Sequence, residues 1–485
     1  MRTRKICCVT GVVVSLASFG WAQDAPSSPS LEIIAALSDP TLAAVLRDVV
    51  DRNPEISVAE ARTAAERQLA PQHQALPDPQ AAVTAFVLPP ETRVGPQRAT
   101  ITVSQRIPGG NTRKLRSQAA VEGAASSAAE TEALRLRLTT DARRLYHEIA
   151  FLDRSAEVLG SDRSVLDHFE ELARARYAAG SGLQQEVVTI QAEITRIDAR
   201  LSDLAARRAG LVAALNALRD RPGNPVTPTP TGVNGGGETL GWAVLRDRAL
   251  ALRPEMASLT ASARRAGAEA ELAESRSSPD FVFGVTYGWI DRRTDVDVPD
   301  NGQDIFGLTG GVTIPIWGDS IDAGREEATQ RRLVIEQQRR ATVTSIDRQL
   351  EELRGRLPEL RRQLELFEGV LRIQGEQALS SAESAYASGR VAAVSLLEAE
   401  RTLLDIRLAA ARTRADLAIA LAELEGVIAA PLRRNPASAD TTRAARSTDQ
   451  NDITGPLVEI QHPKLDTTHT RDFKPTSVPG NGGVS

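Results

Sequence analysis

Large side chains are scarce in this chain of 485 residues. Aromatic residues make up 4% of it, and it contains two Met and two Cys. Because so few bulky residues cannot fill a thick globular core, close packing of helix against helix is the favoured architecture. A formal net charge of -5 gives no reason to expect a nucleic acid as a partner.

Cysteine is confined to an N-terminal segment, residues 1–22, that has the pattern of a secretory signal peptide. Three basic residues precede an apolar stretch, and small residues flank the expected cleavage site. A signal anchor is the alternative, but the apolar stretch is shorter than the ~20 residues that a spanning helix needs. Cleavage would remove Cys7 and Cys8, so the exported chain would hold no disulfide and no cysteine-based metal site.

Residues that could carry catalysis or bind a cofactor are not grouped in the sequence. His147-Glu148 begins like a zinc-protease motif, but Phe151 stands where the second histidine is required. Acidic residues crowd the segment from Asp291 to Asp304, where a calcium site and a charged, solvent-facing loop are the alternatives. We therefore expect no enzyme, no catalytic residue, no cofactor and no resident metal ion.

An internal repeat organises the chain. Pro54 and Pro79 recur as Pro254 and Pro279, and the motif Tyr-x-x-Gly occurs at residues 177–180 and again at 386–389. The preserved order of such matches over about 170 residues indicates a duplication. The predicted segments are a signal peptide at 1–22, an N-terminal extension at 23–40, a first structural repeat at 41–220, a linker at 221–239, a second repeat at 240–430 and a flexible tail at 431–485.

Each repeat opens with an amphipathic helix, which is followed by two strand-like segments. In the strand-like segments large apolar residues alternate with small or polar ones, most clearly at 281–289. This period of two fits a sheet with lipid on one side and water on the other, and a sandwich core would show the same alternation. The helices are expected at about 41–70 and 240–276, and the strands near 81–88, 100–107, 281–289 and 306–316. The aromatic residues expected at a lipid interface are Phe281, Phe283, Tyr287, Trp289 and Trp317.

Long helices complete both repeats. Leucine or isoleucine recurs every seven residues along them, as at Leu152, Leu159 and Leu166, which predicts left-handed pairs of helices. A helix of about 66 residues is roughly 100 Å long at ~1.5 Å per residue. Pro358 predicts a kink or a short break in the second repeat. These helices are expected at about 112–177, 183–219, 320–386 and 392–429.

This organisation resembles the outer-membrane efflux protein family, the TolC-like channels of drug and metal export systems. The resemblance covers about residues 41–430. Besides the duplication, the motifs that carry it are Thr102–Pro108, Arg176–Gly180 with its second-repeat partner, Gln184–Val188 and Ser395–Glu400. It implies a mainly α fold with a small β portion, in which long coiled-coil hairpins form an α-barrel and four strands per chain enter a trimeric 12-stranded transmembrane β-barrel.

The resemblance also implies where the protein works and with what. It implies a homotrimer in the outer membrane of a Gram-negative cell, with its helical portion in the periplasm. The implied partners are a periplasmic adaptor protein, an inner-membrane efflux pump and outer-membrane lipid.

Residues that close the periplasmic aperture in this family carry over by position. Tyr386 matches a tyrosine that ties the helices shut, and Glu186 matches the acidic residue that it contacts. Glu398 matches one of two acidic positions that ring the aperture, and the other is Ser395, so a trimer would hold three carboxylates instead of six. The ends of the helical hairpins, where an adaptor would bind, are marked by Tyr177, Gly180, Gly389 and Arg390.

Two functions fit these observations. The first is a passive exit duct that receives substrates from a pump and releases them outside the cell. The second is an exported, envelope-associated coiled-coil scaffold without channel activity, because a heptad pattern alone is typical of ordinary coiled coils. The two-faced strands in an exported chain favour the duct.

Overall fold

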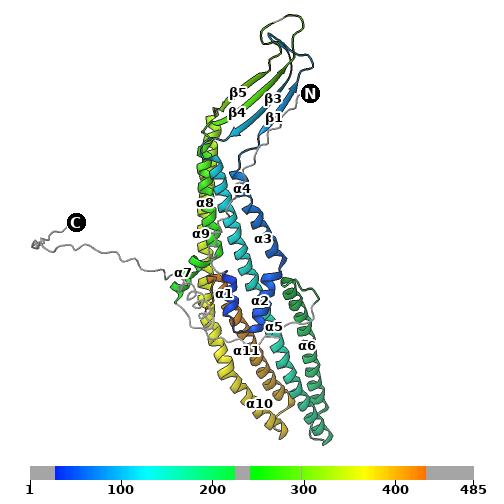
Figure 1. Cartoon of the computed structure of the whole chain (residues 1–485). Helices are drawn as coiled ribbons and strands as arrows, with labels where there is room; N and C mark the ends of the chain where they lie inside the picture. The colour runs from blue at the N-terminus through cyan, green and yellow to red at the C-terminus, as the bar shows by residue number, and fades with distance from the viewer. Residues whose placement is uncertain (1–27, 224–240, 297, 433–485) are drawn as a thin grey trace, which may run out of the picture. The chain divides into compact units, whose positions relative to one another are not determined.

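The computed structural model describes residues 28–223, 241–296 and 298–432 (Figure 1). The predicted signal peptide lies outside the described residues, as do nearly all of the predicted linker and tail. In chain order the elements are α1 (Pro29–Ala36), α2 (Pro40–Arg52), α3 (Pro54–Arg67), α4 (Leu69–Gln74), β1 (Gln80–Ala85), β2 (Glu91–Thr92), β3 (Gly95–Ile107), α5 (Thr112–Ala178), α6 (Gln184–Leu218), α7 (Trp242–Leu252), α8 (Pro254–Ser275), β4 (Asp280–Ile290), β5 (Ile305–Thr313), α9 (Gly318–Glu365), the π-helix η1 (Leu366–Leu371), α10 (Arg372–Ala387) and α11 (Ala393–Ile428).

The elements follow the same order in both halves of the described chain. Short helices lead into antiparallel strands, and the strands lead into a long helical hairpin: α5 and α6 in the first half, and α9, η1, α10 and α11 in the second. The predicted fold class, mainly helical with long hairpins and four antiparallel strands, is confirmed. The two-residue strand β2, which pairs with β3, is an addition that the sequence did not predict.

A proline divides the opening helix of each repeat, and the sequence prediction missed both breaks. Helices α3 and α8 begin at Pro54 and Pro254. Proline has no N–H to donate and holds the residue before it in extended backbone, so that residue ends one helix and precedes the next. Asn53 also caps α3, because its side-chain oxygen accepts a hydrogen bond from the N–H of Glu55 at 2.9 Å.

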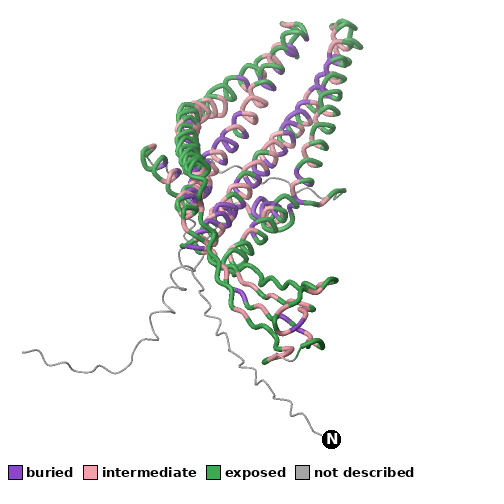
Figure 2. Tube along the Cα trace, turned by 90° about the horizontal axis from the view of Figure 1, so that it is seen from above, coloured by how far each residue is buried: buried purple, intermediate pink, exposed green. Residues whose placement is uncertain are grey.

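The strands form one antiparallel sheet in the order β1-β3-β4-β5, so β1 and β5 are its edges. The register places Ile101 opposite Tyr287, and Tyr287 opposite Phe306, so apolar side chains of three strands share one face. This face is open to the outside, and Leu308 on β5 is 80% exposed. Threonine, serine and glycine predominate on the opposite face, which also carries Arg106 and Val282. No second sheet covers either face in the described ranges, so the sandwich interpretation fails there (Figure 2).

The heptad positions form the core between the long helices. α5 has 67 residues, about 100 Å at ~1.5 Å per residue. Its Leu159 and Leu166 are buried against Ile190 and Ile197 of α6, in a cluster that also includes residues of α10 and α11. Figure 2 shows buried positions recurring along the long helices. The sheet precedes α5 and the hairpin turn follows it, so the two lie at opposite ends of this helix (Figure 1).

Within the described ranges, every helix is too short or too polar to cross a membrane.

The second long helix has no break at Pro358, which was one of the two expectations for this position. Helix α9 continues through Pro358, and the irregular turn is η1, which begins at Leu366. A π-turn holds more residues than an α-turn, so it shifts the heptad register of the residues around it. The heptad leucines before η1, Leu350 and Leu357, are buried. Leu371, which stands 14 residues after Leu357 at the end of η1, is 36% exposed.

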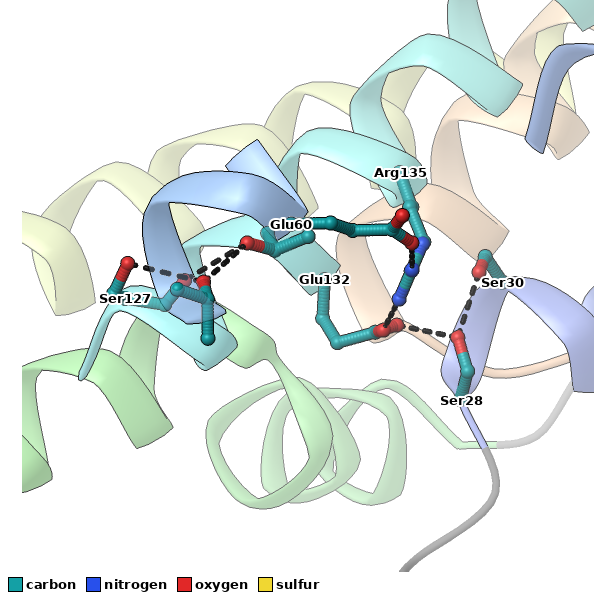
Figure 3. Close-up of polar contacts among 8 residues, drawn as sticks. Ser28, Ser30, Glu60, Ser127, Glu132 and Arg135 are labelled. Carbon is teal, nitrogen blue, oxygen red and sulfur yellow. Dashed lines mark hydrogen bonds and ion pairs between the residues drawn. The ribbon is translucent and has the colours of Figure 1, made fainter. Parts of the chain in front are cut away.

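The N-terminal extension contains a helix, α1, that the sequence prediction did not include. Ser28, just before it, bonds to Ser30 at 2.8 Å and donates to Glu132 of α5. Arg135 of α5 pairs with Glu132 and with Glu60 of α3 (Figure 3). These partly buried, charge-assisted bonds fix α1 and α3 on the surface of α5.

Gly426 of α11 allows a close approach to α5. A Cβ at this position would lie 2.7 Å from Oγ1 of Thr140, a hydroxyl that already donates to the carbonyl of Leu136 at 2.8 Å. We expect Gly426→Ala to lower the free energy of unfolding by about 1–3 kcal/mol through overpacking. In the matched change Gly160→Ala the Cβ meets nothing within 4 Å, so a gain of up to ~1 kcal/mol is expected. Chemical denaturation measures both, and equal effects would contradict the close contact.

Candidate functional site

Matching turns end α5 and α10, one in each repeat. The N–H of Gly180 donates to the carbonyl of Tyr177 at 3.0 Å, and the N–H of Gly389 donates to the carbonyl of Tyr386 at 2.9 Å. The two glycines have φ of +69° and +74°, a left-handed conformation that a residue with a Cβ adopts only with strain. The Tyr-x-x-Gly spacing is therefore the sequence signature of these helix ends.

The structure brings Tyr386 of α10 together with Glu186 in the first turn of α6. Tyr386 is fully buried, and its hydroxyl donates to Oε2 of Glu186 at 3.2 Å. The other oxygen, Oε1, accepts a hydrogen bond from the N–H of Ala393, the first residue of α11, at 3.4 Å. Burial, followed by the charge of Glu186, raises the pKa of Tyr386 to about 12, so the phenol stays a donor at neutral pH. One carboxylate thus joins the end of α10 to the starts of α6 and α11.

Arg176, near the end of α5, completes this cluster, and the sequence analysis did not single it out as a site residue. Its Nη1 donates to the carbonyl of Tyr386 at 2.6 Å, and its Cζ lies 4.4 Å from the centre of the Tyr386 ring. Its Nη2 donates to the carbonyl of Ser181 at 3.3 Å. A guanidinium group is attracted to an aromatic face, and its planar fork can reach two carbonyls at once. Arg176 lies in a motif that marks the turn, but its partner is 210 residues away, so no local pattern signals the contact.

The other predicted aperture and hairpin-end side chains lie outside this buried cluster. Ser395 and Glu398 are exposed in the first turns of α11. Tyr177 is 50% exposed, although it holds the same place in its turn as the fully buried Tyr386. Arg390 is exposed, and its Nε donates to the hydroxyl of Ser388 at 2.8 Å.

The aromatic residues predicted at a lipid interface are all exposed, from 41% for Tyr287 to 75% for Trp317. Four of them share one face of β4, and Trp317 immediately precedes α9. This leaves aromatic rings on the apolar face of the sheet and at the junction of the sheet with the helices. The four on β4 are Phe281, Phe283, Tyr287 and Trp289.

Acidic residues after β4 pair with arginine. Asp291 lies 2.7 Å from Arg98, and Asp295 lies 2.7 Å from Arg293. Of the two interpretations of this segment, these pairs support the charged loop. In the part of the chain that the structure describes, no group of three or more His, Cys, Asp or Glu residues could hold a metal ion.

Replacing Arg176 tests whether it holds the two hairpin ends together. Arg176→Ala removes the stacking and both hydrogen bonds, so we expect the free energy of unfolding to fall by about 1–3 kcal/mol. Arg176→Lys should recover only part of this loss, because lysine keeps the charge but not the planar fork. Arg174→Ala is the matched control: its exposed pair with Glu170 spans one helical turn and is worth about 0.5 kcal/mol. If denaturation found the two alanine variants equally stable, the connecting role of Arg176 would be wrong.

Comparison with known proteins agrees with this geometry. Residues 245–430 match the family model described as outer membrane efflux protein. None of the curated proteins compared matches the chain in sequence.

Several solved structures share the fold over both halves of the described chain. VceC from Vibrio cholerae is 20% identical, with a TM-score of 0.67 over 81% of this chain and 97% of VceC. MtrE from Neisseria gonorrhoeae, an outer membrane channel in its open state, is 16% identical, with a TM-score of 0.68 over 85% and 95%. The outer membrane channel CmeC from Campylobacter jejuni is 14% identical, with a TM-score of 0.67 over 92% and 98%. Residues 245–430 thus match the outer membrane efflux protein family, and both halves of the described chain share the fold of these channels.

Proposed function

We propose that this chain is an outer membrane efflux protein and works as a homotrimeric exit channel. It receives substrates from an inner-membrane pump through a periplasmic adaptor and conducts them passively out of the cell. The observation that carries this proposal is the sheet, which has one apolar face open to the outside and two unpaired edges, β1 and β5. An apolar face of this kind suits lipid, and the threonine, serine and glycine of the other face suit water.

The two sheet edges support the trimer. In hydrocarbon an open edge leaves backbone N–H and C=O groups without partners, which costs several kcal/mol per group. Pairing of β5 in one copy with β1 in the next would remove every edge once the ring closes. Three copies that each supply β1, β3, β4 and β5 would give the 12-stranded barrel that the resemblance implies. The long helices would then continue from this barrel as the wall of a periplasmic tube.

The hairpin turns would form the periplasmic end of this tube. There Tyr386, Glu186 and Arg176 hold α5, α6, α10 and α11 together within one chain, and we assign them to the closed aperture. Glu398 would contribute one carboxylate per chain to a ring around the opening. The exposed surface around Tyr177, Gly180, Gly389 and Arg390 would face the adaptor.

Removing the contact between Tyr386 and Glu186 tests the aperture assignment. In the double variant Glu186→Gln, Tyr386→Phe the carboxylate and the phenol donor are lost while both side-chain shapes are kept. We expect single-channel conductance in planar bilayers to rise by about twofold or more, because the helices at a constriction are released. Tyr177→Phe is the matched control, since this tyrosine holds the same place in its turn but is half exposed.

The same recordings separate the channel from the scaffold alternative. A channel should fractionate with the outer membrane, behave as three chains in detergent and conduct ions. A protein that fractionated with the periplasm and conducted nothing would support the scaffold. Conductance that was unchanged in the double variant would leave the channel standing and overturn the aperture assignment alone.

Charge at the proposed opening is expected to set ion selectivity. Glu398→Gln should lower the preference for cations, because the ring of carboxylates that focuses the field is lost. Ser395→Glu should raise this preference by restoring a second acidic ring. Reversal potentials in a salt gradient measure both changes, and a selectivity that stayed the same in both variants would place these residues away from the pore.

A further inference from the structure

Three buried carboxyl groups meet in the seam between the two repeats, and the predicted aperture includes none of them. Asp162 lies on α5, Glu193 on α6 and Glu400 on α11, with exposed fractions of 4%, 2% and 1%. Each one acts electrostatically on its neighbours in the group. A carboxylate buried without a partner is costly, so the group needs compensating positive charge or a proton.

Two arginines compensate the negative charge of Glu193. Its Oε2 contacts Arg401 of α11 and Arg196, which follows it by one turn on α6. Two guanidinium groups on one carboxylate compensate its negative charge inside the seam.

Asp162 and Glu400 lack such donors. In the described residues neither carboxyl oxygen of Glu400 receives a hydrogen bond, and Oδ2 of Asp162 receives none. An ionised carboxyl group can only accept, so two adjacent carboxylates cannot bond to each other. One proton turns Glu400 into a donor, and Asp162 lies within its hydrogen-bonding reach.

The remaining charges around the pair are engaged elsewhere or act without a hydrogen bond. Arg407 of α11 lies 3.6 Å from Glu376 of α10, and Arg200 of α6 acts on Asp162 by charge attraction. Glu193 of α6 and Arg401 of α11 also act on the pair by charge. The three arginines lower the cost of one negative charge on the pair and the charge of Glu193 raises it, but none of these groups offers a donor to a second negative charge.

We propose that Asp162 and Glu400 form a buried binding site for one proton. The proton comes from solvent and forms an O–H bond on Glu400, which donates to the carboxylate of Asp162. With the proton bound, the pair carries one negative charge. Without it, two negative charges on α5 and α11 face each other inside the apolar seam and repel.

The pKa shifts agree with this geometry. Burial, followed by the hydrogen bond and the charge of Asp162, raises the pKa of Glu400 from 4.5 to about 9, and burial also raises the pKa of Asp162. Because the folded chain holds the proton more tightly than the unfolded chain, the stabilisation is complete below pH 4.5. It is lost progressively as the pH rises towards about 9.

The position of the pair relates the proton to the hairpin ends. Glu400 follows Ala393 on α11 by about 10 Å, at ~1.5 Å per residue, and Ala393 is the residue whose N–H bonds to Glu186. Proton loss would therefore weaken the seam next to the contact of Glu186 with Tyr386, and conductance should rise at alkaline pH. This effect on conductance rests on the proposed channel function, whereas the proton site itself does not.

Infrared spectroscopy of the whole protein in detergent tests the site. A protonated carboxyl group has a C=O stretch separate from that of a carboxylate. At pH 7 we expect the wild-type protein to show a carboxylic acid band that disappears as the pH rises through about 9. Glu400→Gln should lose this component, whereas Asp405→Asn, which removes an exposed acid of the same helix, should keep it.

Comparing the infrared spectra of the variants separates the band of Glu400 from the bands of other protonated acids. Burial also raises the pKa of Glu423, so its contribution must be common to all the spectra. Asp162→Asn removes the acceptor of the proposed bond and should shift the band of Glu400. If neither variant changed the band, or if the wild-type protein showed none at pH 7, the proton site would be disproved.

Denaturation at several pH values gives an independent readout. Between about pH 5 and 9 the unfolding equilibrium constant of the wild-type protein should rise more steeply than that of Glu400→Gln, by up to about tenfold per pH unit. Parallel pH dependences would contradict the site. If the protein showed the carboxylic acid band and the steeper pH dependence but conducted no ions, the channel would be rejected and the proton site kept. If it conducted ions but showed neither the band nor the steeper pH dependence, the proton site would be rejected and the channel kept.

Discussion

Close packing along α5 is the constraint on which the rest of the described structure depends. The N-terminal helices α1 to α4 pack on it, as do α6, α8 and α11, and the remaining helices pack on these neighbours. Helices that approach this closely need leucine and alanine at their contacts, which explains why the chain has so few aromatic residues. The largest fully buried side chains lie at junctions instead: Tyr146 donates to Asp39, the N-cap of α2, at 2.8 Å, and Tyr386 joins the hairpin ends.

The sequence predicts those parts of the fold that depend on local pattern. The long helix expected at 112–177 is Thr112–Ala178, and the one expected at 392–429 is Ala393–Ile428, because heptads and the glycine turns mark them. The breaks at Pro54 and Pro254 were signalled by proline and were missed. The π-turn η1 could not be predicted in the same way, because no proline marks it. Pro358 lies within the continuous helix α9, and the heptad register shifts only after it, at η1.

Two of the acidic residues of the proposed proton site and its surroundings stand at heptad positions that are normally apolar. Asp162 stands between Leu159 and Leu166, and Glu193 stands between Ile190 and Ile197, each at the spacing of a buried position. This spacing predicts that the acids are buried, and the sequence interpretation passed over it. It does not say which group each acid meets, because the contacts of Glu400 with α5 and of Arg401 with α6 cross from one repeat to the other. A contact between helices about 200 residues apart in the sequence depends on how the helices pack in three dimensions. The sequence pattern of one helix does not contain this information.

The two repeats share one turn geometry but not one set of partners, and this difference explains why only one of the two turn tyrosines is buried. Arg176 precedes Tyr177 directly, whereas the residue that precedes Tyr386 is Ala385, so the turn of the second repeat has no guanidinium at the matching position. Glu186 is the third residue of α6, and the third residue of α11 is the uncharged Ser395. Tyr386 therefore receives both the cation and the carboxylate from the first repeat, while the second repeat offers Tyr177 neither at these positions. A duplicated backbone thus became asymmetric through a few side chains, and at the two turns only the tyrosine of the second repeat is held by residues of the other repeat.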